Sequence, residues 1–95
     1  MKMGEWKMGF SWRVYLVKCG DGSLYCGVTN NIEKRLAIHN AGKGARYTRR
    51  RLPVTLLLTS RVMDKREALK LERQVKKQRA ATKVDYLKKF CKNKE

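Results

Sequence analysis

The feature that most restricts the fold of this chain is a pair of short β-like runs on either side of a tight-turn sequence. Residues 13–19 (RVYLVKC) and 24–29 (LYCGVT) are rich in β-branched and aromatic residues, which favour strands. Residues 20–23 (GDGS) separate them, and glycine beside aspartate is typical of hairpin turns. The sequence therefore predicts a β-hairpin near the start of the chain.

A helix, a loop and a third strand are predicted after the hairpin. Asn30 or Asn31 can cap the helix, and Gly42 can end it. Residues 42–53 (GKGARYTRRRLP) are expected to form a loop of glycines and cations. Residues 54–59 (VTLLLT) are apolar enough for a strand buried in the centre of a sheet.

Two further helices are expected in the remaining sequence. Asp64 can cap a long helix over about residues 65–79, and Thr82 can cap a last, shorter one. The long helix has an apolar stripe at helical spacing, made up of Ala68, Leu71 and Val75 and widened by Leu69. The last helix would turn three residues inward, namely Val84, Leu87 and Phe90. The order ββαβαα predicts an α+β fold in which helices flank a small three-stranded antiparallel sheet.

The length and composition limit what this chain can be. Its 95 residues allow one domain, which we place at residues 12–91, between a mobile tail at 1–11 and a frayed end at 92–95. The cysteines form no C-x-x-C pair and are predicted to be reduced thiols. An apolar run of about 18 residues is absent, and the N-terminus does not resemble a signal peptide, so we expect a cytoplasmic protein without a membrane span, with association to the nucleoid as the alternative.

The charge of the chain points to a polyanionic partner. Lysine and arginine total 24 against 8 aspartates and glutamates, for a net charge of +16 and a pI near 10.3. Nucleic acid is the favoured partner for such an imbalance, and an anionic membrane surface or a ribosome is the alternative. Basic charge alone supports only binding, so other residues must distinguish a nuclease from a passive binder.

A spaced set of residues resembles a known family. In chain order the set is Tyr15, Tyr25-Cys26-Gly27, Arg35, His39 and Glu72. Its order and spacing resemble the GIY-YIG nuclease superfamily, and residues 21–49 are similar to small stand-alone bacterial members. The resemblance covers about residues 12–90. It implies the α+β fold described above and an activity that hydrolyses phosphodiester bonds.

The resemblance also implies a role for each side chain. Glu72 would hold a single Mg²⁺ or Mn²⁺ ion, and Arg35 would grip the scissile phosphate. Tyr15 would act as general base or orient the attacking water, Tyr25 would bind the water or the phosphate, and His39 would take or relay a proton. Because a free tyrosine has a pKa of about 10, we expect cations such as Arg35 to lower that of Tyr15.

From the residues alone, each candidate also has a structural explanation. Both tyrosines could simply pack in their strands. Arg35 could be one more surface cation, and His39 could be a packing residue. Glu72 could be an ordinary helix glutamate paired with Arg73 or Lys76.

A site that contains both Tyr15 and Tyr25 requires a particular geometry of the hairpin, which a structure can test. A two-residue loop at residues 21–22 would pair Tyr15 with Val28 and point Tyr15 away from Tyr25. Both tyrosines can serve one site only if they lie on the same face of the sheet. We therefore predict an odd-length loop or a β-bulge.

A separate set of residues is predicted to contact nucleic acid. Its members are Lys43, Arg46, Tyr47, Arg49, Arg50, Arg51 and Lys76. The glycines of the loop would let the backbone approach a phosphate chain, and Tyr47 could stack on an exposed base. We predict sequence-independent binding whose log–log salt slope is about −4 to −5 for about five phosphate contacts.

The leading hypothesis is a small divalent-metal-dependent DNA endonuclease that is structure-selective and linked by kinship to repair or recombination. The alternative is a non-catalytic nucleic-acid-binding module with the same fold. It is favoured by the first motif, which reads RVY at residues 13–15, and by the lack of an asparagine between Glu72 and Asn93. An RNA- or ribosome-associated protein is a third hypothesis. Cutting both strands would require self-association, a protein partner or two successive attacks.

Overall fold

The predicted hairpin forms the centre of the fold. The structure, a computed structural model, describes residues 11–91, so the predictions for residues 1–10 and 92–95 lie outside the described residues. Strands β1 (Arg13–Lys18) and β2 (Leu24–Thr29) pair in antiparallel fashion. Gly22, in the turn, has a φ of +87°, a conformation that glycine adopts without steric cost. The hairpin prediction is confirmed.

Strand β1 is the central strand of a three-stranded antiparallel sheet with the order β2-β1-β3. Residues 14–17 of β1 are all buried, as expected for a strand that is covered on both faces. Strand β3 (Thr55–Thr59) lies at an edge, where Leu56 and Leu57 are 36% and 41% exposed. The prediction of a centrally buried third strand is therefore wrong, because β3 has a sheet neighbour on one side only.

Two short helices connect β2 to β3. Helix α2 (Ile32–Asn40) begins where predicted, because the Asn31 side chain accepts a hydrogen bond from the Lys34 N–H at 3.0 Å. Gly42 follows its end with a φ of +78°. Helix α3 (Arg46–Arg49) is a single turn within the segment that was predicted to be a loop.

The C-terminal helices are shorter than or shifted from those predicted. Helix α4 (Lys65–Lys76) is capped by Asp64 as expected, but it ends before residue 79. At the end of α4, the Lys83 ammonium donates hydrogen bonds to backbone carbonyls of the last helical turn and of the residues that follow it, including Gln78 O at 2.7 Å. Helix α5 (Ala80–Lys88) has Arg79 at its N-cap. Thr82, the predicted cap, lies inside the helix and donates to the Arg79 carbonyl.

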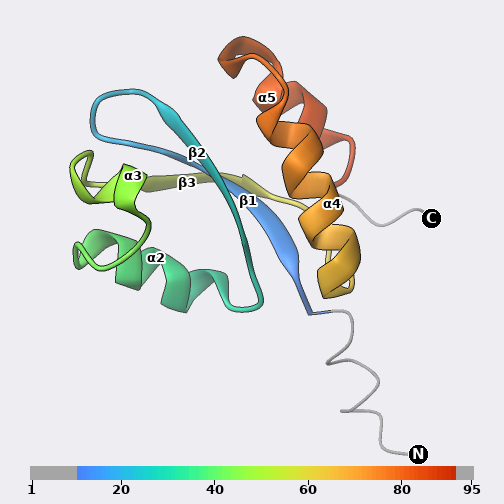
Figure 1. Ribbon diagram of the computed structural model, residues 1–95, viewed down its shortest axis with the longest axis horizontal. Coiled ribbons are helices and arrows are strands. Elements are labelled where there is room, and N and C mark those ends of the chain that lie inside the picture. The colour runs from blue at the N-terminus through green and yellow to red at the C-terminus, as the bar shows by residue number, and fades with distance from the viewer. Residues whose placement is uncertain (1–10, 92–95) are drawn as a thin grey trace, which may run out of the picture.

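Helices cover both faces of the sheet (Figure 1), with α2 and α3 on one side and α4 and α5 on the other. Toward α4 and α5 the sheet packs into an apolar cluster whose buried members are Val14, Leu16, Cys26, Met63, Ala68, Leu71, Val75 and Leu87. The predicted inward residues Val84 and Phe90 are partly buried against it. The stripe of α4 is confirmed except at Leu69, which is 42% exposed and does not widen it.

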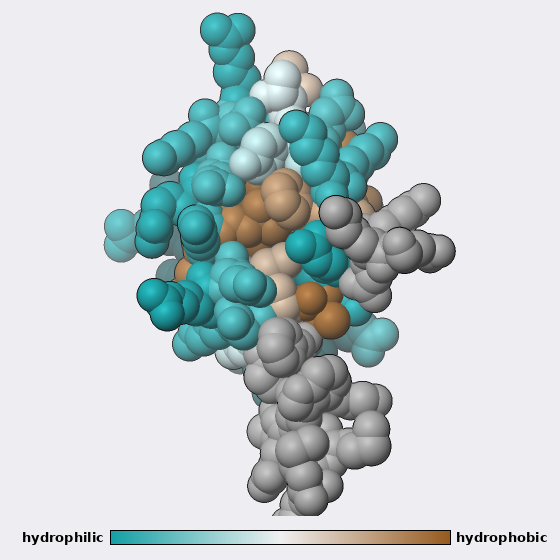
Figure 2. All heavy atoms as spheres, turned by 90° about the vertical axis from the view of Figure 1, so that its right-hand side faces the viewer, coloured by the Kyte–Doolittle hydropathy of each residue, from teal (hydrophilic) through white to brown (hydrophobic). Residues whose placement is uncertain are grey.

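The observed architecture is thus the predicted α+β fold with α3 added. The face that carries α4 and α5 is largely hydrophilic, with apolar surface in the middle of the view (Figure 2).

All of the cysteines are free, and burial raises the pKa of Cys26 to about 12. Within residues 11–91, no helix has the length and apolar character that a membrane crossing needs.

Candidate active site

An open pocket of about 380 Å³ lies along strand β2, at the edge of the sheet that β3 does not occupy. Elements from both helical layers reach it, because α2 contributes on one side and α4 on the other (Figure 1). All of the predicted catalytic side chains line this pocket, namely Tyr15, Tyr25, Arg35, His39 and Glu72. Residues far apart in the sequence therefore meet at one place in the structure.

The hairpin register places the tyrosines on one face. Tyr15 pairs with Gly27 and Tyr25 pairs with Val17, while residues 19–23 lie between the paired strand ends. Since Gly27 and Tyr25 are two positions apart on β2, both tyrosine rings project to the same side. Their ring centres are 6.4 Å apart. The prediction of an odd-length loop is confirmed.

Gly27 leaves room for the ring of its cross-strand partner. A Cβ atom at this position would lie 2.5 Å from Tyr15 Oη and 2.6 Å from Tyr15 Cζ, closer than nonbonded atoms approach. The Tyr15 ring therefore lies across the backbone of β2. Any larger residue at position 27 would move the phenol away from the pocket.

His39 is buried and makes hydrogen bonds through both ring nitrogens. Nε2 is 2.9 Å from Tyr15 Oη, and Nδ1 is 2.8 Å from Thr48 Oγ1. The Thr48 hydroxyl donates its hydrogen to the Ala45 carbonyl at 2.9 Å, so Oγ1 must accept from Nδ1–H. Nε2 then carries the lone pair and accepts from the Tyr15 hydroxyl. This pattern assigns one tautomer to His39.

Two residues that hold His39 were not predicted to belong to the site. Thr48 lies on α3 and is fully buried, and Gly44 packs so closely on the imidazole that a Cβ atom there would lie 2.9 Å from His39 Cε1. The sequence predicts for Gly44 only a place in a loop whose backbone can approach a phosphate chain. The available signal was weak: a small residue and a hydroxyl shortly after the histidine, in a segment dominated by cations.

The protonation of the site differs from expectation at Tyr15. Burial raises the pKa of Tyr15 well above its usual value, and Tyr25 adds to this effect, whereas Arg35 opposes it. The expectation that cations would lower this pKa is wrong for the protein alone, because desolvation outweighs the guanidinium. Burial also raises the pKa of Tyr25. For His39, burial and then Arg35 lower the pKa, so the imidazole is neutral near pH 7.

The position of Glu72 fits both explanations that the sequence allows, namely a pocket residue and a helix glutamate in an ion pair. Its carboxylate lines the pocket and also lies 3.2 Å from the Lys76 ammonium, one helical turn along α4. The Glu72 side chain is 20% exposed. Lys76 also lies 5.9 Å from the centre of the Tyr25 ring. The carboxylate is thus accessible from the pocket but already has a cationic partner.

The donor set fits a hydrated magnesium-type ion. Glu72 is the one carboxylate among the described residues that line the pocket, and both nitrogens of His39 have partners. In the described part of the chain, no three His, Cys, Asp or Glu side chains gather as a metal-binding group. Mg²⁺ usually keeps several waters and takes only one or two protein carboxylates, so a single glutamate beside a phosphate site is compatible with it.

The residues that were predicted to contact nucleic acid lie in different parts of the structure. Lys43 lines the candidate pocket with Arg35. Arg49 Nε donates to the Gly44 carbonyl at 3.1 Å, and so supports the segment that packs on His39. The other members of the loop set line a second pocket on α3, namely Arg46, Tyr47, Arg50 and Arg51. Their contact with nucleic acid stays a prediction.

Comparison with known proteins shows the family that the chain is similar to. The family model described as "GIY-YIG catalytic domain" matches residues 11–85. A UPF0213 protein of Nitratidesulfovibrio vulgaris is 54% identical over 67 residues, which is 70% of this chain but only 61% of that relative's length.

Two solved structures resemble the fold. The solution NMR structure of the protein EF2693 from E. faecalis is 42% identical, with a TM-score of 0.56. That of the UPF0213 protein BH0048 from Bacillus halodurans is 38% identical, with a TM-score of 0.50. Each similarity covers 81% of this chain and 82% of the other chain.

Proposed function

The chain belongs to the GIY-YIG catalytic-domain family, and we propose that it is a divalent-metal-dependent endonuclease that hydrolyses phosphodiester bonds in DNA. The family domain is that of a nuclease, which implies a nucleic-acid substrate. The observation that carries the proposal is the convergence of Tyr15, Arg35, His39 and Glu72 on one pocket beside an open sheet edge. A base, a cation for the phosphate and a carboxylate are the groups that this hydrolysis needs.

The hydrogen bonds within the pocket suggest a route for the proton. As water attacks phosphorus and the P–O bond to the leaving oxygen breaks, the water proton passes to Tyr15 Oη, and the phenol passes its own proton to His39 Nε2 at 2.9 Å. The Nδ1–H bond to Thr48 Oγ1 then holds the imidazolium in place. The leaving oxygen takes a proton from solvent, and the imidazolium later returns its proton to solvent. This route does not need a phenolate before the reaction, which agrees with the raised pKa of Tyr15.

Side chains from both helical layers would bind the phosphate and stabilise its negative charge. Arg35 and Lys43 line the pocket and would bind the nonbridging oxygens. Glu72 would hold the metal ion, which when bound would stabilise negative charge on the phosphate. Lys76 would have to release Glu72, and its ammonium would then be free to contact the phosphate chain.

The substrate in this proposal is DNA of a particular structure, such as a nick, a flap, a branch or a single strand, with RNA as the alternative. The basic surface provides contacts to the backbone that carry no sequence information. Repair or recombination is proposed from family kinship. Cutting both strands would use self-association, a partner protein or two successive attacks.

A second candidate is a module of the same fold that binds nucleic acid without cutting it. The Glu72–Lys76 ion pair favours this candidate, because it neutralises the carboxylate on which metal binding depends. Both candidates predict similar binding. They differ in whether any metal ion restores cleavage.

The test is a cleavage assay on nicked, flapped, branched and single-stranded DNA with Mg²⁺ or Mn²⁺. Glu72→Gln removes the carboxylate charge from the pocket, and Glu67→Gln is the matched control because Glu67 is an exposed glutamate on the same helix. We expect metal-dependent cutting that Glu72→Gln abolishes and Glu67→Gln retains. Equal binding by all three proteins, without cutting under any metal, would overturn the nuclease proposal in favour of the binding module.

A further inference from the structure

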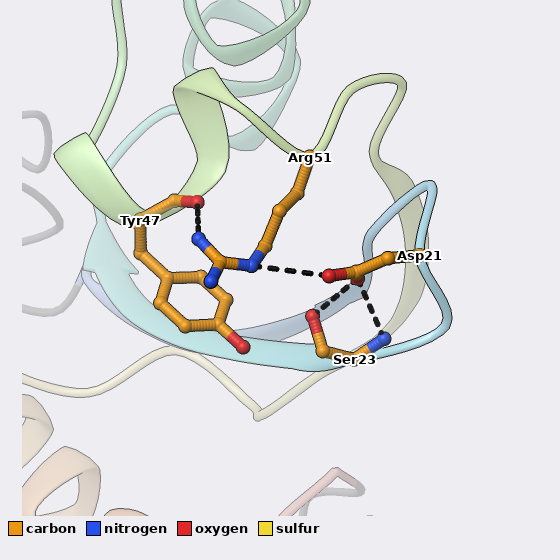
Figure 3. Close-up of polar contacts among 4 residues, drawn as sticks. All are labelled: Asp21, Ser23, Tyr47 and Arg51. Atoms are coloured by element: carbon orange, nitrogen blue, oxygen red, sulfur yellow. Dashed lines mark hydrogen bonds and ion pairs between the residues drawn. The ribbon is translucent and has the colours of Figure 1, made fainter.

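A succession of planar side chains leads away from the active-site pocket. Tyr25, which lines the pocket, stacks on Tyr47 with ring centres 6.0 Å apart and planes inclined by 23°. The Arg51 guanidinium lies over Tyr47, with its central carbon 3.9 Å from the ring centre (Figure 3). The pocket is therefore continued by flat surfaces toward the hairpin loop.

The Arg51 guanidinium is held in place from both ends. Its Nη1 donates to the Tyr47 carbonyl at 2.8 Å, and its Nε donates to Asp21 Oδ2 at 3.1 Å (Figure 3). Asp21 is itself ordered, because Oδ1 accepts from the Ser23 hydroxyl and the Ser23 backbone N–H. The Arg51 side chain is still 35% exposed. It is thus an oriented, accessible plane with little conformational freedom left to lose on binding.

Two further arginines lie in the same pocket as this plane. Arg46 and Tyr47 lie in α3, Arg50 and Arg51 follow its end, and all of them line a pocket of about 600 Å³. Of these arginines, only Arg51 has an ion-pair partner in the part of the chain that the structure describes. A flat surface next to unpaired guanidinium groups matches the chemistry of a nucleotide, which has a planar base and an anionic phosphate.

We propose that Tyr47, Arg51, Arg46 and Arg50 form a subsite for one unpaired nucleotide of the substrate strand, next to the scissile phosphate. The base stacks on the Arg51 guanidinium, and its phosphate lies against Arg46 and Arg50. A base inside a duplex cannot do this, because its neighbours in the stack cover its faces. The position of the scissile phosphate rests on the proposed function, but the binding itself does not.

The proposal names the substrate class of the active site. DNA with an unpaired nucleotide beside the cleavage point, as in a single strand or a flap, can fill the pocket and the subsite together. Continuous duplex can reach only the backbone contacts. Loss of one stacking contact of this kind weakens binding by roughly 5- to 150-fold.

The experiment measures binding without metal, in the Glu72→Gln background, so that it does not depend on cleavage. The probe is a single-stranded DNA oligonucleotide that carries 2-aminopurine, whose fluorescence responds to stacking, at one position, compared with the same oligonucleotide in a duplex. Arg51→Gln and Tyr47→Leu remove the plane and its support. Tyr47→Phe keeps the ring, and Lys88→Gln removes one exposed cation on α5, in the other helical layer.

We expect Arg51→Gln and Tyr47→Leu to weaken single-strand binding at least fivefold and to remove the 2-aminopurine response, with less than a twofold change in duplex binding. Tyr47→Phe and Lys88→Gln should keep the response. Equal losses for single strand and duplex in Arg51→Gln, or a full response in that variant, would overturn the subsite. Since Arg51 is partly exposed, Arg51→Gln should fold even if Tyr47→Leu does not. A normal response with no cleavage by the native protein would instead overturn only the nuclease proposal.

Discussion

Both faces of strand β1 pack against apolar side chains, but only the face toward α2 and α3 also carries polar chemistry. Toward α4 and α5, Val14 and Leu16 are fully buried in a cluster of aliphatic side chains. Toward α2 and α3, Tyr15 is almost as deeply buried, but its hydroxyl is bonded to His39. Burial therefore contributes to stability on both faces, and on the second face it also sets protonation, because it keeps a phenol and an imidazole neutral.

The largest effect is expected on catalysis, from removing one hydroxyl on the polar face. Tyr15→Phe deletes the proton carrier between water and His39, and we expect cleavage to fall by about 10²- to 10⁴-fold. The matched control is Tyr86→Phe, which deletes a hydroxyl bonded to Gln74 in the other layer. Cleavage rates at saturating substrate measure the difference. Equal rates for the two variants would show that the Tyr15 hydroxyl takes no part in the reaction.

Next in size is a change in stability from the apolar face. Leu16→Ala should lower the free energy of unfolding by about 2–5 kcal/mol, because it leaves a cavity in a fully buried cluster. Leu56→Ala, on the exposed edge of β3, should change it by about 0.5 kcal/mol or less. Urea unfolding measures both. The folded fraction of Leu16→Ala should cleave normally, and a selective loss of its cleavage would mean that the two faces are not separable.

The smallest expected effect is the dependence on pH. The pKa of His39 in the folded protein lies below its ordinary value of about 6.5, so the unfolded chain binds the proton more readily. Stability should therefore fall as the pH decreases from about 6.5 through the folded pKa. Cleavage should fall in the same window, because a protonated His39 cannot accept from Tyr15.

The Asp21 carboxyl affects stability in a different pH range from His39. Hydrogen bonds from Ser23, with a further contribution from Arg51, hold the pKa of that carboxyl below its usual range, so its contribution disappears only below a pH of about 4. Urea unfolding and cleavage measured at closely spaced pH values distinguish the two. Stability that increases as the pH falls from 6.5 to 5 would contradict the assignment of His39.

How far the sequence predicts this molecule depends on whether the information is local. The hairpin and the caps at Asn31 and Asp64 follow from spacing and turn chemistry, whereas the placement of both tyrosines on one face was predicted from the requirement of a shared site. The edge position of β3 does not follow from spacing, since an apolar run of six residues looks the same whether it has one sheet neighbour or two. The prediction that Leu69 widens the buried stripe of α4 is wrong for a related reason. On this helix, positions that face the core lie next to positions that line the pocket, and sequence spacing does not distinguish the two.

The residues that support the candidate site were harder to predict than the residues that line its pocket. The packing of α3 on α2 brings Thr48 and Gly44 to His39, and no periodicity in a segment rich in arginine indicates that contact. The raised pKa of Tyr15 likewise depends on burial from several directions. These features arise from tertiary contacts and could not be predicted from spacing alone.

The most direct test of the account is the protonation state of the imidazole, since the chain contains one histidine. Nitrogen-15 NMR of the native protein across pH 4–8 reports both the tautomer and the pKa of His39. The proposed proton route requires a neutral ring at pH 7 with the proton on Nδ1, a pKa below about 6.5, and a change in tautomer population in Thr48→Val. A proton on Nε2 at pH 7, or a pKa above 6.5, would contradict the proposed route from water through Tyr15 to His39.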